Sequence, residues 1–336
     1  MSVDSYRVPS VRGWRRDGVF IQLGDSLAGY PTWDRPTVII SDGPYGVNGF
    51  PGDPPSVDPL PEMYAPHIRQ WSERALPSTT LWFWNTELGW ATVHPVLVKW
   101  GWEYRGCHIW NKGLGHVAGN ANSKTLRKFP VVTEVCVQYI RSVQLPTKEH
   151  EKPLPIKDWL RAEWERTGLP FSKTNAVCGV KNAATRKYFT QDSLWYFPPS
   201  EAFQQLADYA NAYGNPSGRP YFSIDGIHPL TGAEWELMRA KFTCLFGVNN
   251  VWNAPPVRGP ERVKLGRKAL HLNQKPQSLT QLIIESSSDE GDVVWEPFGG
   301  MCTGAVASLQ LHRRCYSAEI LPEFYEAAVK RLQTFS

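Results

Sequence analysis

The stretch TVIISDGPYGVNGFPGDPP, residues 37–55, brings a short apolar run directly to an acid and an aromatic ring. Residues 37–40 favour a strand, because β-branched side chains fit a pleated, half-buried surface. The run is followed, after Ser41, by Asp42, Gly43, Pro44 and Tyr45. Residues 46–61 then contain Gly and Pro at a density that neither a helix nor a central strand accommodates. We therefore predict a strand that carries these four residues at its open end and is followed by a mobile loop.

Strand patterns and helix patterns alternate on both sides of this stretch. Before it, residues 18–25 form an apolar run that ends on Gly and Asp. After it, residues 62–76 show helical spacing and residues 79–84 again favour a strand. The same alternation returns near the C-terminus, where a strand pattern at 291–297 precedes a Gly-rich turn. Such alternation is typical of crossover units, so the fold class we predict is α/β, with a mixed, mostly parallel central sheet that helices cover on both faces.

The alternation is interrupted between residues 145 and 240. Short helical patterns broken by Gly fill the first part of this segment, and a turn-rich stretch follows. We therefore expect residues 19–144 and 241–336 to form the two halves of one α/β domain. Residues 145–240 are expected to form an inserted, mainly helical module.

Basic residues concentrate in the middle of the chain. Residues 111–190 contain 14 Lys and Arg against 6 Asp and Glu, although the net charge of the whole chain is only +4. Such a concentration is the footprint of a polyanion-binding surface, although an ordinary solvated basic face gives the same count. The residues that we predict to contact a polyanion are Lys124, Arg127, Lys181, Arg186 and Lys187.

The composition favours a globular protein without a membrane span or a metal site. The chain has 336 residues, of which 42% are hydrophobic and 20% charged, so it can bury a substantial core. No apolar run is long enough to span a bilayer and the N-terminus shows no export signal, so we expect a cytoplasmic protein. The six cysteines include no Cys-x-x-Cys pair, which favours reduced thiols and no metal.

A Gly-rich turn follows the strand pattern near the C-terminus. In VVWEPFGGMCTGAVAS, residues 293–308, Gly299 and Gly300 come directly after the apolar run, and a helix pattern begins at Thr303. Glycines let a backbone approach a ligand closely, and the spacing matches no phosphate-binding pattern. Glu319 ends the next strand pattern, where an acid can accept hydrogen bonds from ribose hydroxyls. The turn and the acid together predict a nucleoside cofactor without phosphates.

Several motifs together resemble one family, the amino-group DNA methyltransferases that use S-adenosylmethionine, in the order called the beta class. The motifs that carry the resemblance are SDGPYG (41–46), HLNQKP (271–276) and EPFGGMCTG (296–304). Three further segments are also similar: GDSL (24–27), HIWNKG (108–113) and GVNNVW (247–252). The resemblance covers nearly the whole chain except residues 145–240. It implies a Rossmann-like methyltransferase fold in which 145–240 is the target-recognition module.

The resemblance assigns the reaction to the first motif. An exocyclic amino group of adenine or cytosine is a poor nucleophile, because its lone pair is delocalised into the ring. Hydrogen bonds from that amino group to the Asp42 carboxylate and the Gly43 carbonyl would localise the lone pair, while Pro44 stiffens the turn. Tyr45 would stack on a base swung out of the duplex. The methyl donor then lies in line with the amino nitrogen, and no metal is needed.

The resemblance also implies a cofactor pocket built from both ends of the chain. Asp25 would reach the adenine amino group of the cofactor, and Glu319 would hold its ribose. The other residues expected in this pocket are His271, Gln274, Lys275, Glu296, Pro297, Phe298, Gly299, Gly300, Cys302 and Thr303. Three positions depart from the family pattern, where Pro, Asp and Gly are usual: they are Gly43, Glu296 and Cys302.

The target base follows from the frame of the first motif. The family motif has four positions and ends on Tyr, so counting back from Tyr45 makes Asp42 its first position. In this family, an acid at the first position occurs mostly in enzymes that methylate adenine N6. The resemblance therefore implies site-specific methylation of adenine N6 in double-stranded DNA. Cytosine N4 is the alternative, as is a same-fold methyltransferase that acts on RNA or on a protein amide.

A third alternative is a DNA-binding protein that has kept the fold without the activity. It would be expected to lose motif residues, whereas this chain retains Asp42, Pro44, Tyr45, Phe298 and Glu319. The sequence leaves open whether a restriction endonuclease accompanies the enzyme and whether the chain forms a homodimer.

Overall fold

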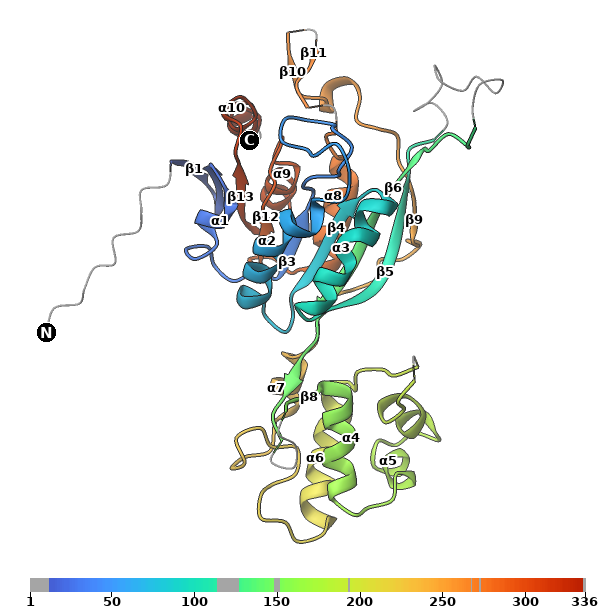
Figure 1. Cartoon of the computed structure of the whole chain (residues 1–336). Coiled ribbons are helices and arrows are strands. Elements are labelled where there is room, and N and C mark those ends of the chain that lie inside the picture. The colour runs from blue at the N-terminus through green and yellow to red at the C-terminus, as the bar shows by residue number, and fades with distance from the viewer. Residues whose placement is uncertain are drawn as a thin grey trace, which may run out of the picture. The chain divides into compact units, whose positions relative to one another are not determined.

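The structure is a computed structural model of the chain, and it describes residues 12–113, 127–147, 152–192, 194–266, 268–271 and 273–334. Within these residues, nine strands form one central sheet (Figure 1). Their order across the sheet is β1 (Gly13–Arg16), β2 (Val19–Leu23), β13 (Arg314–Glu319), β12 (Val293–Glu296), β3 (Val38–Ser41), β4 (Thr80–Asn85), β6 (Thr133–Arg141), β5 (Trp102–Asn111) and β9 (Val251–Asn253). The strands from β2 to β4 are parallel, and the sheet becomes antiparallel at β1 and between β4, β6 and β5. The predicted mixed, mostly parallel sheet is confirmed.

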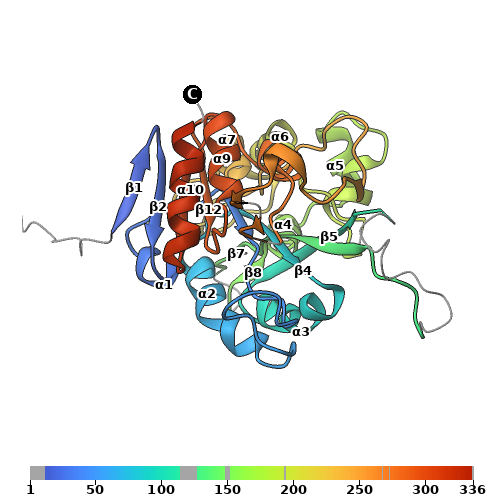
Figure 2. The same cartoon turned by 90° about the horizontal axis from the view of Figure 1, so that it is seen from above.

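Helices cover both faces of this sheet (Figure 2). Alternate residues of a strand point to opposite faces, and β3 shows this directly. Val38 and Ile40 lie in a core with α8 (Gln277–Ser287), α9 (Thr303–Gln310) and α10 (Pro322–Thr334). Ile39 lies in a second core with α2 (Leu60–Arg74) and α3 (Glu87–Lys99). Burial on both faces explains why β3 is apolar along nearly its full length.

The parallel strands present their carboxyl ends at one edge of the sheet. The strands β3, β12 and β13 end there at Ser41, Glu296 and Glu319. The antiparallel strands contribute to the same edge, because Trp110 near the end of β5 pairs with Glu134 near the start of β6. In open α/β sheets, ligands bind outside the carboxyl ends of the strands. The fold therefore brings the ends of five strands to the place where a ligand is expected.

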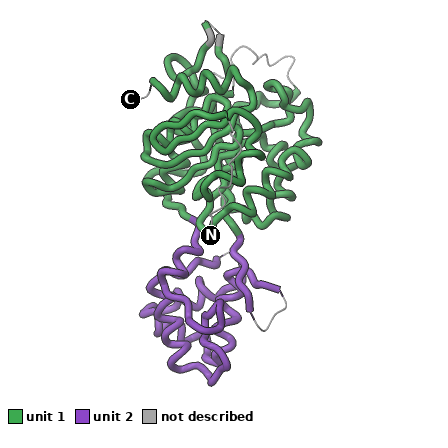
Figure 3. Tube along the Cα trace, turned by 90° about the vertical axis from the view of Figure 1, so that its left-hand side faces the viewer, with its two compact units in different colours: residues 1–141, 241–336 green, residues 142–240 purple. Residues whose placement is uncertain are grey.

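The chain divides into two compact units (Figure 3). Unit 1 contains Met1–Arg141 and Lys241–Ser336, and unit 2 contains Ser142–Ala240. Unit 1 also includes the short helix α1 (Ser26–Gly29), the 3-10 turn η3 (Gly259–Glu261) and the strand pair β10 (Lys264–Leu265) and β11 (Lys268–Ala269). Unit 2 begins at residue 142, whereas the predicted module begins at 145, and both end at residue 240. That unit 2 recognises a target sequence stays a prediction.

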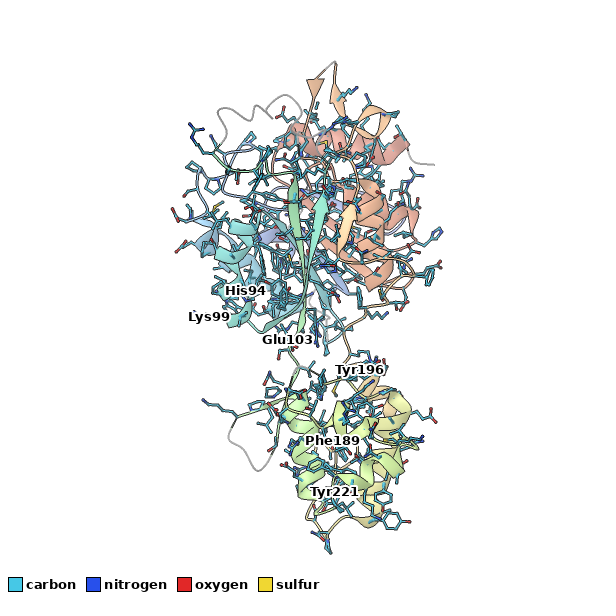
Figure 4. The ribbon with its side chains drawn as sticks, turned by 90° about the vertical axis from the view of Figure 1, so that its right-hand side faces the viewer. His94, Lys99, Glu103, Phe189, Tyr196 and Tyr221 are labelled. Carbon is cyan, nitrogen blue, oxygen red and sulfur yellow. The ribbon has the colours of Figure 1, made fainter. Side chains whose placement is uncertain are left out.

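Unit 2 has a core of its own. Its elements are β7 (Gln144–Leu145), β8 (Leu154–Pro155), α4 (Ile156–Arg166), α5 (Ser172–Val177), the π-helical turn η2 (Ala184–Tyr188), α6 (Ser200–Tyr213) and α7 (Gly232–Glu236). The rings of Phe203 and Trp235 stack in this core with their centroids 4.3 Å apart. Phe189 and Tyr221 are two further buried aromatic side chains of the same core (Figure 4). The unit is mainly helical, as the sequence predicts.

Three other properties bear on the predictions from composition. Among the described residues, no helix combines the length and the apolar character that crossing a membrane requires. All six cysteines are free thiols. In the described part of the chain, no group of three or more His, Cys, Asp or Glu side chains is arranged to hold a metal ion.

Candidate active site

A cavity of about 290 Å³ lies at the carboxyl ends of the parallel strands. Most residues predicted for the site line it: Asp25, Asp42, Gly43, Pro44, Tyr45, His271, Gln274, Lys275, Glu296, Pro297, Phe298, Gly299, Gly300, Thr303 and Glu319. These residues come from the beginning and the end of the chain. The fold therefore brings the predicted catalytic motif and the predicted cofactor turn to one cavity.

Asp42 follows β3 directly and is held by two hydrogen-bond donors. Its Oδ1 accepts hydrogen bonds from the Tyr45 hydroxyl at 2.9 Å and from Lys275 Nζ at 2.7 Å. No described residue donates to its Oδ2, and the Gly43 carbonyl likewise has no donor in the described part of the chain. One carboxylate oxygen is thus fixed, whereas the other oxygen and the neighbouring carbonyl keep their capacity to accept hydrogen bonds.

The main chain of the motif is fixed at Pro44 and packed closely at Gly43. The Pro44 carbonyl accepts hydrogen bonds from the Tyr64 hydroxyl and from Asn85 Nδ2, each at 3.0 Å. A Cβ at position 43 would lie 2.7 Å from Tyr64 Oη and 2.8 Å from the ring of Phe298. The absence of a side chain at Gly43 therefore lets the motif approach Phe298 closely.

Four charged side chains form a cluster, which we call the charge cluster: Asp42, Lys112, Glu134 and Lys275. Glu134 and Lys275 are buried, whereas the side chains of Lys112 and Asp42 are 11% and 23% exposed. Lys275 Nζ lies 3.4 Å from Glu134 Oε2, and Lys112 forms an ion pair with Glu134 Oε1. The Tyr45 hydroxyl lies 3.2 Å from Glu134 Oε2, so it bridges the two carboxylates. Two positive and two negative charges balance, as burial of charge requires.

Burial and pairing act in opposite directions on the protonation of the charge cluster. Burial works against the charged form of Lys275, but the carboxylates of Asp42 and Glu134 outweigh it and raise the pKa of Lys275. Burial also works against the charged form of Glu134, but Lys275 and Lys112 outweigh it and lower the pKa of Glu134. Burial, assisted by the two carboxylates, raises the pKa of Tyr45 well above its ordinary value. Near neutral pH, Tyr45 is therefore a neutral hydroxyl donor between two carboxylates.

The turn from β12 to α9 forms another wall of the cavity. Gly299 donates its N–H to the Ala318 carbonyl at 2.7 Å, and a Cβ on this glycine would lie 2.8 Å from Ser317 Oγ. Gly300 has a φ of +51°, and its N–H donates to Glu319 Oε2 at 2.7 Å. Neither position accepts a side chain without strain. The turn therefore presents backbone rather than side chains to the cavity, beside the Glu319 carboxylate.

Glu296 stabilises the start of α9. Its Oε1 accepts a hydrogen bond from the Gly304 N–H at 2.6 Å, and its Oε2 accepts from the Ala305 N–H at 3.1 Å and from Ser317 Oγ at 3.0 Å. Burial nevertheless dominates and raises the pKa of Glu296 to about 7. The carboxyl group is thus engaged by the helix and by Ser317, although the residue lines the cavity.

The prediction that Cys302 lies in the cofactor pocket is not supported by its position. Cys302 has a φ of +50° directly before α9 and is fully buried. Its Sγ lies 3.4 Å from Ser317 Oγ, and its side chain belongs to the core that includes α8, α9 and α10. The left-handed backbone turns this side chain into the core, which is why it does not line the cavity.

Three more predicted residues line the cavity in different ways. Asp25 is exposed and caps α1, where its Oδ1 accepts the Leu27 N–H at 2.9 Å. The side-chain amide of Gln274 donates to the carbonyl of Glu261, the last residue of η3, and accepts from the Val263 N–H, so it holds the end of that turn in place. His271 Nδ1 is buried and has no hydrogen-bond partner among the described residues, and burial lowers the pKa of this side chain.

The sequence reasoning missed Lys112, Glu134 and His67. Glu134 is the single acid in an apolar strand pattern, and such an acid indicates a buried carboxylate that needs a partner. His67 lines the cavity with its ring centroid 4.9 Å from that of Phe298, and burial lowers its pKa to about 4. His67 is therefore neutral near pH 7 and contributes to the cavity wall as an uncharged ring.

None of the described residues predicted to bind DNA lines the cavity. Lys181, Arg186 and Lys187 are exposed in unit 2, and the last two belong to η2. Arg127 is exposed in unit 1, and Lys124 lies outside the described residues. Contact of these side chains with DNA stays a prediction.

Residues 233–330 match the model of the N6/N4 methyltransferase family, which is described as DNA methylase. This match is confined to the C-terminal part of the chain. The matched segment contains the Gly-rich turn, Lys275 and Glu319, and it does not include Asp42–Tyr45.

Curated relatives match shorter segments. The DNA adenine methyltransferase YhdJ of Escherichia coli strain K12 is 33% identical over 87 residues, which are 26% of this chain and 28% of YhdJ. The type II methyltransferase M.HinfI of Haemophilus influenzae is 38% identical over 86 residues, which are 25% of this chain and 24% of that protein. The chain thus spans about a quarter of the length of these two relatives. A solved structure of the M1.HpyAVI–SAM complex aligns with 93% of this chain and 98% of that chain, at 14% identity and a TM-score of 0.48.

Proposed function

We propose that this protein transfers a methyl group from S-adenosylmethionine to the N6 amino group of an adenine swung out of double-stranded DNA, at a specific sequence. The observation that carries the proposal is the position of Asp42. Its carboxylate lies in the cavity that the Gly-rich turn also lines, with one oxygen fixed by two donors. The DNA methylase family of the C-terminal segment supports the same class of reaction.

The chemistry requires two acceptors for one planar amino group. Asp42 Oδ2 and the Gly43 carbonyl are adjacent, and no described residue donates to either of them. Hydrogen bonds to both would localise the lone pair of the amino nitrogen. Tyr45 and Lys275 prevent the carboxylate from turning away, because both bond to Oδ1. The rate of methyl transfer would then come mainly from holding the amino group and the methyl donor in position, rather than from general acid or base catalysis.

The cavity wall formed by the Gly-rich turn fits S-adenosylmethionine, which would supply a methyl group on a positively charged sulfur. Gly299 and Gly300 leave the backbone accessible to a ligand, and Glu319 offers a carboxylate for ribose hydroxyls. His271 Nδ1 is buried without a partner among the described residues, which is costly unless a ligand satisfies it. These residues therefore fit a nucleoside-containing cofactor.

Adenine is proposed over cytosine because an acid occupies the first motif position. One relative with a matching segment is named a DNA adenine methyltransferase. In unit 2, the exposed cations Lys181, Arg186 and Lys187 would contact phosphates, which supply affinity without reading sequence.

The proposal is tested by incubating the protein with labelled S-adenosylmethionine and, in parallel, duplex DNA, RNA or a mixture of proteins. We expect label in duplex DNA, and none when Asp42→Ala replaces the wild type. The matched control is Asp58→Ala, because Asp58 is an exposed acid in the loop that follows the motif. Label in RNA or protein but not in DNA would overturn the proposed substrate. Binding of DNA without any transfer would favour the non-catalytic alternative.

A further inference from the structure

A buried acid, Asp53, lies close to the motif, in the loop rich in Gly and Pro. Asp53 is 5% exposed, and its carboxylate accepts hydrogen bonds from four backbone N–H groups. Oδ1 accepts from Tyr45 at 2.7 Å and Gly46 at 2.8 Å, and Oδ2 accepts from Val47 at 3.1 Å and Gly49 at 2.9 Å. Hydrogen bonds to an ionised acceptor are stronger than those to a neutral one. A single carboxylate thus organises the main chain from the motif into the loop.

The loop is folded back on itself around this carboxylate. The Asn48 N–H donates to the Pro54 carbonyl, and the Asp53 N–H donates to the Phe50 carbonyl, each at 3.0 Å. Gly46 has a φ of +72°, and a Cβ there would lie 2.6 Å from the Ser56 carbonyl oxygen. The sequence predicts a mobile loop from its Gly and Pro content, and in the structure these hydrogen bonds join residues 45–54 to one another. The density of Gly and Pro reflects the tight path of the chain around Asp53.

The folded loop forms part of the cavity wall. Phe50, Pro51 and Gly52 line the cavity together with the catalytic motif and His271. The ring centroids of Phe50 and His271 are 6.3 Å apart, and those of His271 and Phe324 are 5.1 Å apart. The loop therefore joins the motif to the residues on the cofactor side of the cavity.

We propose that Asp53 is a positioning residue for methyl transfer: its carboxylate fixes the peptide of Tyr45 and holds Phe50 in the wall of the reaction cavity. The inference rests on the proposed function and deepens it. Asp53 itself does not line the cavity, so it acts through Tyr45 and the loop. Because the Tyr45 hydroxyl bonds to Asp42, a shift of the Tyr45 backbone moves a donor that fixes the reacting carboxylate.

Asp53→Asn tests this role with little change in size. The carboxamide keeps one acceptor oxygen and turns an NH2 group toward two backbone N–H groups that need acceptors. The matched control is Asp58→Asn, since Asp58 lies in the same loop, is exposed and accepts a hydrogen bond from Ser56 Oγ at 3.0 Å. We expect Asp53→Asn to increase hydrogen exchange at the amides of residues 45–49 by about tenfold or more, while the control leaves them unchanged.

Kinetics separate positioning from a merely structural role. We expect kcat to fall about tenfold or more in Asp53→Asn, with the Kd for S-adenosylmethionine within about threefold of wild type, because residues 296–303 and Glu319 stay in place. An unchanged kcat in a variant that has lost amide protection would overturn the proposal. So would unchanged protection. If the wild type transfers no methyl group, the proposed function fails, and the exchange measurement still decides whether Asp53 anchors the loop.

Phe50→Ala covers the case in which Asp53→Asn does not fold. This variant leaves the carboxylate and its four donors intact and removes the ring that the loop places in the wall. We expect normal protection of residues 45–49 and a kcat reduced about tenfold. Normal kcat in Phe50→Ala would show that the loop is not part of the reaction cavity.

Discussion

Replacing Glu134 by glutamine perturbs the charge cluster while nearly preserving its shape. The variant removes one negative charge and leaves Lys112 and Lys275 with Asp42 as the remaining anion of the cluster. The side chains of Glu134, Lys112 and Lys275 are 10%, 11% and 4% exposed, so water compensates little of the loss. Removing one partner from a buried ion pair typically costs about 3–5 kcal/mol. We expect Glu134→Gln to lower the free energy of unfolding by about 3 kcal/mol, because Asp42 still compensates Lys275.

Urea denaturation at pH 7 measures this loss. The control is Glu103→Gln, because Glu103 forms its ion pair with Arg105 at 3.3 Å with 49% of its side chain exposed. Glu103→Gln should lower the free energy of unfolding by less than about 1 kcal/mol. The double variant Glu134→Gln/Lys112→Met removes one charge of each sign and should be less destabilised than Glu134→Gln alone. A cost below about 0.5 kcal/mol for Glu134→Gln would refute the coupling of these charges.

The same cluster predicts how stability depends on pH. The pKa of Glu134 is lower in the folded protein, so its contribution is present above its ordinary value of 4.5 and is lost as the pH falls through the folded value. The pKa of Lys275 is higher in the folded protein, so its contribution is present below 10.5 and is lost as the pH rises through the folded value. The difference in unfolding free energy between wild type and Glu134→Gln should therefore shrink in acid.

Three other outcomes follow from the site. Asp42→Ala should abolish methyl transfer while the Kd for S-adenosylmethionine, measured by calorimetry, stays within about threefold of wild type; loss of binding as well would give Asp42 a role in the fold. Joint replacement of Lys181, Arg186 and Lys187 by glutamine should weaken DNA binding and reduce the slope of log K against log salt by about 2–3, and an unchanged slope would exclude that surface. Burial raises the pKa of Glu296 from 4.5 to about 7, so its ionisation opposes folding. The free energy of unfolding of the wild type should therefore fall by up to about 3 kcal/mol between pH 5 and 8, and Glu296→Gln should lack this fall; parallel curves would contradict the burial of that carboxyl.

Patterns of neighbouring residues in the sequence were sufficient to predict several strands and helices of the central domain. The strand before Asp42 could be predicted because an apolar β-branched run ends abruptly at Asp, Gly and Pro. The helical spacing at 62–76 corresponds to α2, which spans Leu60–Arg74. In unit 2 the helix α6 was not recognised, although its buried face has helical spacing at Phe203, Leu206, Ala207 and Ala210.

The site was predictable where a motif contains its own chemistry, and not where contacts join distant strands. Asp42 and Lys275 each stand in a motif that carries the family resemblance. Because the resemblance implies that these motifs meet at one site, the presence of both residues at one cavity could be expected. Lys112 and Glu134 meet because β5 and β6 are antiparallel and in a register that no local pattern specifies. Asp53 bonds to backbone N–H groups, which leave no trace in the identity of the side chains. Cys302 was assigned to the pocket from its place in the motif, whereas in the structure a left-handed backbone turns that side chain into the core.

The most direct test of the proposed reaction identifies the methylated nucleoside itself. DNA from cells that express the wild type or Asp42→Ala is digested to nucleosides and analysed by mass spectrometry. We predict N6-methyladenine in DNA from cells with the wild-type protein and none above background with Asp42→Ala. N4-methylcytosine in its place would contradict the proposed base, and equal N6-methyladenine with both proteins would contradict the role of Asp42.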